Sequence, residues 1–323
     1  MKGLLFITLL AIAGLALLRL SGELAQTRQP RPNSTEDFFN RGVARYLQGD
    51  PEGAMRDFDR AIEIAATISP GAYASNHIGA IFPEPAVIHY NRGVTRYDLR
   101  DWDGAIADFD ESLNLNPHRV MAWIKRGNAR FNKGDLDEAI NDFNLALRLD
   151  PRSIIALNNR GLAWQNKGKL DAALGDYARA LELAPRLTVA LNNRAGIKHD
   201  RGDLRGALND YNRAIEIDPQ LALLYCNRGV TRKALGDLKG AVADYTEAIR
   251  LNPDFNLAYF NRSAALKAMG RGFEAEQDFI HSMRPGKEPG PGKEPGLGKE
   301  PEASLEPPIE GVPATKATYQ KIR

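Results

Sequence analysis

The stretch of sequence that decides the fold repeats itself without a break. Residues 154–187 read IIALNNRGLAWQNKGKLDAALGDYARALELAPRL, and residues 188–221 read TVALNNRAGIKHDRGDLRGALNDYNRAIEIDPQL. Both copies have the same length and share Ala-Leu-Asn-Asn-Arg near their starts and Asp-Tyr in their second halves. A period of this length indicates a supersecondary unit that is stacked several times along the chain.

An Asn-Arg-Gly triplet, or a close variant of it, marks further copies outward from this stretch. Its arginines are Arg41, Arg92, Arg126, Arg160, Arg194, Arg228 and Arg262. The last six are separated by one period each, whereas the first gap, from Arg41 to Arg92, is one period and a half. With each arginine at position seven, the copies begin at Thr35, Ala86, Val120, Ile154, Thr188, Ala222 and Asn256.

Three other positions stay in register with these arginines. Position twenty is alanine in every copy: Ala54, Ala105, Ala139, Ala173, Ala207, Ala241 and Ala275. Position twenty-four is aromatic in every copy: Phe58, Phe109, Phe143, Tyr177, Tyr211, Tyr245 and Phe279. Position thirty-two is proline in five copies: Pro117, Pro151, Pro185, Pro219 and Pro253.

This pattern closely resembles the tetratricopeptide repeat family, whose unit of about 34 residues is a helix–turn–helix. The resemblance covers Thr35 to about Arg284 and implies an all-α, right-handed α-solenoid of about seven helical hairpins. The residue types agree with that fold, because small residues let two helices approach and the proline ends each pair. One pair cannot bury its own apolar face, but stacked pairs can, and they form a groove on their inner side.

The two ends of the chain differ from this body. Residues 3–18 are uncharged and follow Lys2, which is the pattern of a signal sequence or membrane anchor over residues 1–22. We therefore expect an exported protein, periplasmic or secreted, or a protein tethered to a membrane through residues 3–22. Residues 23–34 are expected to be a linker. Residues 285–323 repeat Gly-Lys-Glu-Pro and predict a disordered tail.

The first copy departs from the pattern. Ala66 stands where proline is expected, and an insertion of about residues 69–85 separates this copy from the next. The insertion contains apolar and aromatic residues, among them Tyr73 and Phe82. We therefore keep open whether this segment, or residues 23–34, fills the groove of the solenoid.

Composition excludes several classes of function. The chain has 43 basic and 41 acidic residues, a net charge of +2, so no basic excess points to nucleic acid. Its single cysteine, Cys226, excludes an internal disulfide framework and multi-cysteine metal sites. The five histidines show no metal-ligand spacing, and neither a phosphate-binding loop nor a nucleophile elbow is present. We expect no enzyme, no metal and no cofactor.

A second charged column accompanies the arginines. Position twenty-three is aspartate in every copy: Asp57, Asp108, Asp142, Asp176, Asp210, Asp244 and Asp278. Each aspartate lies almost midway in sequence between the arginine of its own copy and that of the next, as Asp176 does between Arg160 and Arg194, so sequence does not select the partner. We interpret the two columns as ion pairs that fix the register of the repeats rather than as a ligand site.

The family resemblance also implies which positions line the groove. Position six is asparagine in six copies: Asn40, Asn91, Asn159, Asn193, Asn227 and Asn261. A carboxamide both donates and accepts hydrogen bonds, as a peptide unit does, so the column could hold an extended peptide. The alternative is that these asparagines bond neighbouring helices to each other, and the sequence does not decide between the two.

The predicted lining changes along the chain. The first three copies are aromatic, with Phe39, Tyr90 and Phe131 among the lining residues. The fourth and fifth are rich in amides, and the last two carry Lys233 and Lys267. We therefore expect a non-catalytic scaffold that binds an extended peptide or partner protein, with apolar ligand residues at the first end and acidic ones at the last. The alternative is an assembly factor with a self-occupied groove, which acts through self-association or within a membrane complex.

Overall fold

The computed structural model describes residues 34–67 and 84–284. The predicted signal or anchor (1–22), the tail (285–323), nearly all of the linker and most of the insertion lie outside these described residues and stay predictions. In the described ranges, no helix is both long enough and apolar enough to cross a membrane.

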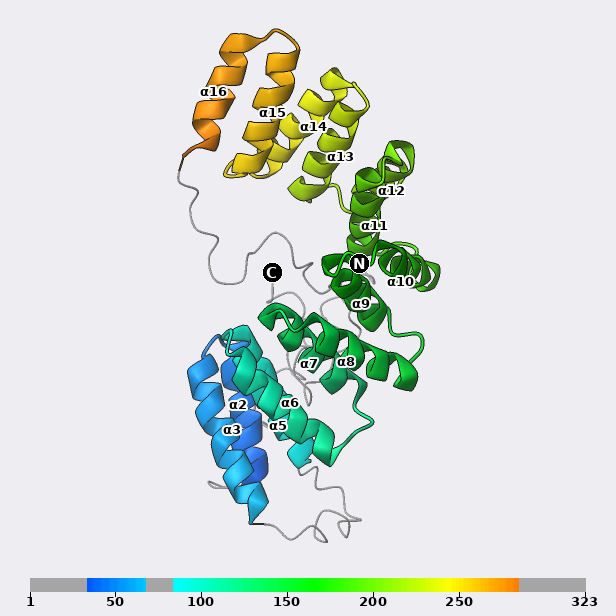
Figure 1. Ribbon diagram of the computed structural model, residues 1–323. Coiled ribbons are helices and arrows are strands. Elements are labelled where there is room, and N and C mark those ends of the chain that lie inside the picture. The colour runs from blue at the N-terminus through cyan, green and yellow to red at the C-terminus, as the bar shows by residue number, and fades with distance from the viewer. Residues whose placement is uncertain (1–33, 68–83, 285–323) are drawn as a thin grey trace, which may run out of the picture. The chain divides into compact units, whose positions relative to one another are not determined.

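The described residues form fourteen α-helices and contain no β-strand. In order, the helices are α2 (Thr35–Leu47), α3 (Pro51–Ala66), α5 (Pro85–Asp98), α6 (Trp102–Leu115), α7 (Val120–Lys133), α8 (Leu136–Leu149), α9 (Ile154–Asn166), α10 (Leu170–Leu183), α11 (Thr188–Asp200), α12 (Leu204–Ile217), α13 (Ala222–Ala234), α14 (Leu238–Leu251), α15 (Asn256–Ala268) and α16 (Gly272–Ser282). Consecutive helices pair into seven hairpins, which confirms the predicted all-α solenoid class (Figure 1).

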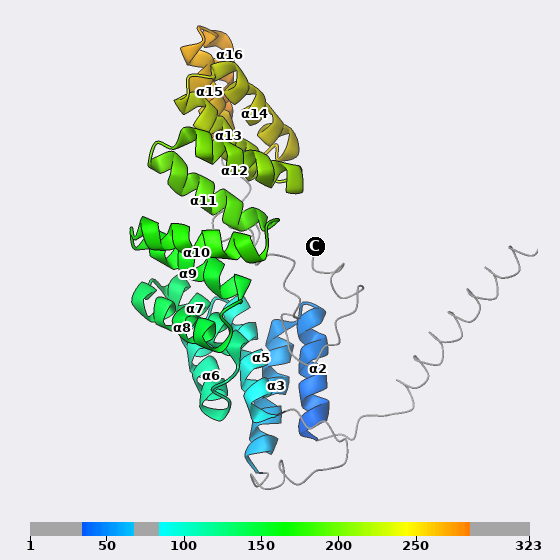
Figure 2. The ribbon, with the colours of Figure 1, turned by 90° about the vertical axis from the view of Figure 1, so that its right-hand side faces the viewer.

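The chain divides into two compact units within α5, between Ile88 and His89. The first unit holds the hairpin of α2 and α3. In the second unit each helix from α6 to α15 packs on the next one along the chain (Figures 1 and 2). The first helices of some neighbouring repeats also contact one another, α7 with α9, α11 with α13, and α13 with α15.

Helix boundaries follow the repeat register. Six of the seven predicted copies begin at the residue where their first helix begins, and α5 starts one residue early at Pro85. Gly134 ends α7 in a left-handed conformation with φ of 94°, which a glycine adopts without steric cost. Asp203 and Asp237 then begin α12 and α14, where their carboxylates accept backbone N–H groups of the first turn.

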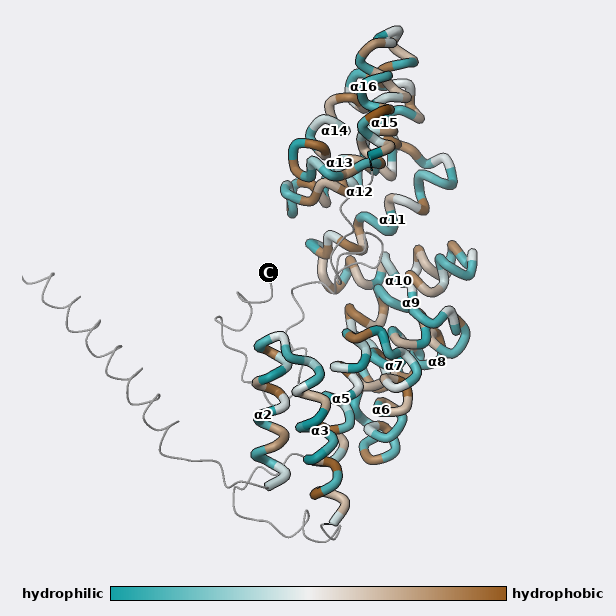
Figure 3. Tube along the Cα trace, turned by 90° about the vertical axis from the view of Figure 1, so that its left-hand side faces the viewer, coloured by the Kyte–Doolittle hydropathy of each residue, from teal (hydrophilic) through white to brown (hydrophobic). Residues whose placement is uncertain are grey.

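Each helix buries one face, and the α2 trace accordingly alternates between hydrophilic and hydrophobic segments (Figure 3). The position-twenty alanines are buried in every hairpin. In the five hairpins that have glycine at position eight, the position-twenty-four ring packs against that glycine. A Cβ atom on Gly127 would lie 2.7 Å from Cε1 of Phe143, and one on Gly229 would lie 2.7 Å from Cε1 of Tyr245. These glycines are therefore required by close packing.

The arginine and aspartate columns pair within each hairpin. All seven arginines bind the aspartate of their own repeat, with Nη2–Oδ1 distances of 2.5–2.7 Å: Arg41–Asp57, Arg92–Asp108, Arg126–Asp142, Arg160–Asp176, Arg194–Asp210, Arg228–Asp244 and Arg262–Asp278. The aspartates are all buried. The partner that the sequence left open is thus the aspartate of the same repeat.

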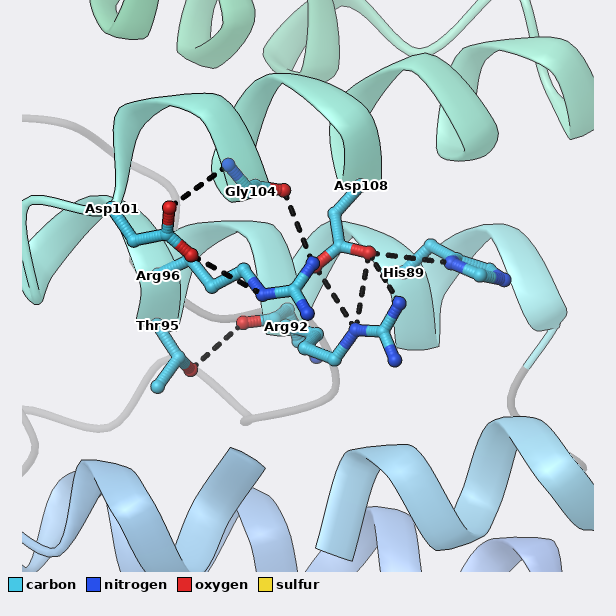
Figure 4. Close-up of polar contacts among 8 residues, drawn as sticks. His89, Arg92, Thr95, Arg96, Asp101, Gly104 and Asp108 are labelled. Carbon is cyan, nitrogen blue, oxygen red and sulfur yellow. Dashed lines mark hydrogen bonds and ion pairs between the residues drawn. The ribbon is translucent and has the colours of Figure 1, made fainter. Parts of the chain in front are cut away.

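The second repeat shows how many groups one aspartate gathers (Figure 4). The Asp108 carboxylate accepts from Nε and Nη2 of Arg92 and from Nη1 of Arg96, and Nδ1 of His89 lies 3.7 Å from its Oδ1 atom. Arg96 also donates to the backbone carbonyl of Gly104. The carboxylate therefore fastens α6 to α5 through side chains from three turns of the first helix.

The same arginines also reach the preceding repeat. The Nη1 atom of Arg160 donates to Oδ1 of Asn144 at 2.7 Å, and that of Arg228 donates to Oδ1 of Asn212 at 2.8 Å. Arg126 and Arg262 make equivalent contacts with Asp110 and Thr246. One guanidinium thus joins its own second helix to the second helix of the repeat before it.

Asp210 illustrates the electrostatics of this ladder. Burial would raise the pKa of its carboxyl, but hydrogen bonds from Arg194 and Lys198, together with their charges, outweigh burial and lower the pKa. Lys198 Nζ lies 2.7 Å from Oδ2, and the aspartate is fully buried. The ionised carboxylate is therefore the form that the folded chain favours.

We predict that Asp210→Asn destabilises the protein by about 1.5–3 kcal/mol at neutral pH, because charged hydrogen bonds to a buried group are lost. The folded-state pKa is lowered, so the contribution of the carboxylate is present at neutral pH and is lost as the pH falls from about 4 through that pKa. Urea unfolding followed by circular dichroism should show the difference from wild type shrinking below about pH 4.

Asp171→Asn is the matched control, because the Asp171 carboxylate pairs with Arg201 at 2.7 Å but is exposed. It should change stability little at any pH. Equal destabilisation by the two substitutions would contradict a structural role for the buried ladder.

Candidate functional site

The structure corrects part of the predicted apolar end of the groove. Phe39 is 4% exposed and packs on Phe58, with ring centroids 6.1 Å apart. Tyr90 is 1% exposed and packs on Phe109 with centroids 5.8 Å apart, and Asn91 is fully buried. The prediction that these three side chains line an accessible surface is wrong, because the two rings turn into their own hairpins and Asn91 is buried as well. The ring of Phe260, at the same position as Phe39 and Tyr90, is by contrast 49% exposed.

The other predicted lining residues are more accessible. Phe131 is half-buried and packs on the edge of the apolar cluster that contains Ile140 and Phe143. Asn40, Lys233 and Lys267 are exposed. Among the described residues neither lysine has an ion-pair partner, so the basic character predicted for the last two repeats is present at the surface.

Three of the asparagines form bonds between repeats. The Nδ2 atom of Asn227 donates to Oδ1 of Asn192 at 2.9 Å, and that of Asn261 donates to Sγ of Cys226 at 3.7 Å. Asn159 donates to Oδ1 of Asn128 at 2.9 Å. These amides thus tie neighbouring first helices together, and each retains a second N–H because a carboxamide has two.

Asn193 differs from the other members of its column. By analogy with Asn227 it would donate to Asn158, but no such bond forms, and Oδ1 of Asn158 is buried without a hydrogen-bond partner in the described part of the chain. Asn193 instead accepts from Asn192 at 3.2 Å and lies beside the Tyr177 hydroxyl. Its amide therefore faces a different environment from those that link repeats.

That environment is a polar pocket of about 350 Å³ built from the fourth, fifth and sixth repeats. Its lining residues are Gln165 from α9, Asn192, Asn193, Gly196, His199 and Asp200 from α11, Tyr211 from α12, and Asn227 and Val230 from α13. This is the amide-rich middle that the sequence indicated. The structure adds Gly196, Tyr211 and Val230, which the sequence reasoning did not place in a site.

A reversal in the repeat pattern explains the space. The fifth repeat reads Ala195-Gly196 where the fourth reads Gly161-Leu162, so the small residue has moved from position eight to position nine. Ala195 denies Tyr211 the ring position that glycine permits elsewhere, and Tyr211 forms a small cluster with Ala195 and Ala207. A Cβ on Gly196 would meet only the Tyr211 hydroxyl, at 3.9 Å. The reversal therefore opens the pocket and brings a tyrosine to its wall.

Hydrogen bonding fixes the state of two pocket groups. Thr231 donates its hydroxyl proton to the backbone carbonyl of Asn227, so its Oγ1 accepts from Nδ1 of His199, 3.1 Å away. In the neutral ring this leaves Nε2 as an acceptor. Burial and the nearby Asp200 carboxylate raise the pKa of Tyr211, so its hydroxyl keeps its proton and can donate.

Cys226 behaves as a packing residue. It is fully buried, and burial raises the pKa of its thiol to about 11, which keeps it protonated. Across the described ranges, no group of three or more histidine, cysteine, aspartate or glutamate side chains is arranged to hold a metal ion. The groups that the pocket offers to a ligand are hydrogen-bond donors, hydrogen-bond acceptors and one carboxylate, that of Asp200.

These features define an all-α protein of repeated helical hairpins with a polar pocket formed by three consecutive repeats. Family models for the tetratricopeptide repeat match residues 90–154, 125–188 and 222–255, and a further TPR repeat model matches residues 195–236. The chain belongs to the tetratricopeptide repeat family.

Solved structures show the same fold at low identity. A tetratricopeptide repeat protein from Parabacteroides merdae ATCC 43184 is 19% identical with a TM-score of 0.60, over 77% of this chain and 91% of that one. PilW, described as a widely conserved type IV pilus biogenesis factor, is 19% identical with a TM-score of 0.56, over 60% of this chain and 90% of that one. A search of curated proteins gave no match.

Because the glycine stands at position eight in the sixth repeat and at position nine in the fifth, replacing it by alanine should have opposite effects on stability in the two repeats. Gly229→Ala should destabilise by about 1–3 kcal/mol, because the new methyl group collides with the Tyr245 ring. Gly196→Ala should stabilise by up to about 1 kcal/mol, because helix propensity rises and the methyl group enters open space. Chemical unfolding of both variants measures the difference, and stabilisation by both would contradict the packing described for position eight.

Proposed function

We propose that the protein is a non-catalytic interaction scaffold that holds an extended segment of a partner protein against the amide-rich first helices of repeats four to six. The observation that carries the proposal is the polar pocket, in which Asn192, Asn193 and Asn227 meet from two helices. Membership of the tetratricopeptide repeat family supports a role in protein interaction at a coarser level.

The chemistry of the pocket suits a peptide in extended conformation. An extended chain exposes N–H and C=O groups that need partners when they lose water. Asn227 uses one N–H toward Asn192 and keeps another, and Tyr211 offers a hydroxyl donor. Acceptors come from amide oxygens and from His199. A peptide unit could therefore satisfy its donor and its acceptor in one place.

Charge at the last two repeats adds a direction to this proposal. Lys233 lies on α13 beyond Val230 of the pocket, and Lys267 occupies the same position of α15. Both are exposed, so we propose that acidic residues of the partner lie near them. Such contacts give salt sensitivity more than affinity, because exposed charges are screened.

The test is selection of linear peptides from a displayed random library on the purified protein, followed by affinity measurement with a selected synthetic peptide. The double variant Asn193→Ala/Asn227→Ala should bind that peptide about 5- to 150-fold more weakly, from about 0.5–1.5 kcal/mol for each lost hydrogen bond. Asn261→Ala is the matched control. It removes the carboxamide at the same repeat position but outside the pocket, so it should leave affinity unchanged.

The competing function is assembly through self-association, and the last repeat favours it. The position-twenty-four ring of Phe279 is 41% exposed, whereas its counterparts Phe109 and Phe143 are at most 1% exposed. Phe273, Ile280 and Met283 are exposed beside it in sequence. Selection that enriches no peptide, together with concentration-dependent sedimentation of the protein, would overturn the scaffold proposal in favour of assembly.

We further propose that the protein acts outside the cytosol or tethered to a membrane, from the uncharged run of residues 3–18 after Lys2. The proposal rests on sequence alone. Fusion of an export-dependent reporter after Ser34 should give activity, and fusion of a cytosol-dependent reporter at the same site should not. The reverse result would refute it.

A further inference from the structure

We infer that the pocket of repeats four to six selects a lysine or arginine side chain of the bound peptide. The inference rests on the proposed function, because the pocket is part of the proposed peptide site. It goes further by naming the side chain that the pocket recognises and the residue, Asp200, that recognises its charge.

The charge balance of the pocket wall carries the first step. Asp200 is its one carboxylate, and no lysine or arginine lies among its lining residues. The cations next to Asp200 in the sequence are already paired: Lys198 with Asp210 at 2.7 Å and Arg201 with Asp171 at 2.7 Å. Asp200 itself has no ion pair or hydrogen-bond partner among the described residues. Its charge is therefore available to a ligand.

The neutral groups around Asp200 are the second step. Neutral His199 has its Nδ1–H directed to Thr231 and so has Nε2 as its acceptor. Gln165 Oε1 accepts from the Tyr177 hydroxyl at 3.0 Å and retains a second lone pair. An ammonium has three donors and a guanidinium has five, so either could satisfy several of these acceptors. An acidic side chain would instead meet the Asp200 carboxylate and be repelled.

The pocket also has room for a long side chain. Every other copy carries a side chain at position nine, the place that Gly196 occupies in the fifth repeat: Val43, Val94, Asn128, Leu162, Val230 and Ala264. The missing side chain leaves room beside Tyr211, in a pocket of about 350 Å³. That volume accommodates a long side chain whose methylene groups contact Val230 and the tyrosine ring while its charged end reaches Asp200.

The experiment uses the same displayed random peptide library on wild type and on Asp200→Asn. Wild type should enrich peptides with lysine or arginine at one fixed position, and Asp200→Asn should still enrich peptides but without that preference. A synthetic peptide selected on wild type should bind Asp200→Asn up to about 5-fold more weakly, because Asp200 is exposed and an exposed ion pair contributes about 0.2–1 kcal/mol. When norleucine replaces the cationic residue of this peptide, binding to wild type should weaken. Binding to Asp200→Asn should not weaken any further, because the variant has already lost the charge that the cation contacts.

Two controls separate the possible failures. Glu216→Gln removes an exposed carboxylate of α12 outside the pocket and should leave both preference and affinity unchanged. Gly196→Leu fills the pocket while the Asp200 carboxylate is retained and should abolish the preference, whereas Gly196→Ala should keep it. Enrichment without a cationic position, or a preference that survives Asp200→Asn, would overturn this inference and leave the scaffold proposal intact. No enrichment on any variant would overturn both.

Discussion

The structure depends above all on one guanidinium in each repeat. Its Nε and Nη2 atoms bind a buried aspartate of the same hairpin, and in four repeats its Nη1 atom reaches the second helix of the repeat before. A buried aspartate is costly unless its charge is matched, so each hairpin closes in the one register that brings the two groups together. The apolar contacts supply most of the burial, but contacts between alanines and aromatic rings do not by themselves fix the register of the two helices. A bidentate ion pair does fix it, because it forms in one register only.

Much of the fold could be predicted from the sequence, because the copies carry the same residue types at the same repeat positions. The helix starts, the alanine and aromatic positions and the existence of the charged columns follow from the repeat period alone. The aspartate that each arginine binds could not be predicted in this way. Each aspartate is almost equally far in sequence from two arginines, and a second helix packed between two first helices could bring it to either one. Distances in the structure settle it in favour of the same repeat.

Prediction of the site failed where one residue type has two possible orientations. Phe39 and Tyr90 occupy position five, which the family pattern assigns to the groove, yet each ring turns toward the position-twenty-four aromatic of its own hairpin. Polar residues occur at the same position in two repeats. Asn192 bonds to Asn193 and Asn227 and lies in the pocket, whereas Asn158 is buried and its Oδ1 atom has no partner among the described residues. The pocket thus lies in the amide-rich middle of the chain, whereas Phe39 and Tyr90 of the predicted aromatic end are buried. The pocket itself had a signal in the sequence, the reversed order Ala195-Gly196.

The junction between repeats four and five lacks the two polar links found between repeats three and four, five and six, and six and seven. Position twenty-five of the fourth repeat is Ala178, so Arg194 finds no oxygen there, and the bond from Asn193 to Asn158 is missing, which leaves Oδ1 of Asn158 unpaired among the described residues. An apolar cluster with Leu157, Leu181 and Leu191 holds this junction instead, together with the contact of Asn193 with the Tyr177 hydroxyl. The pocket draws Gln165 from one side of the junction and Asp200 from the other. A ligand that bonds to both would add a further polar link across this junction, so binding and the packing of these two repeats should stabilise each other.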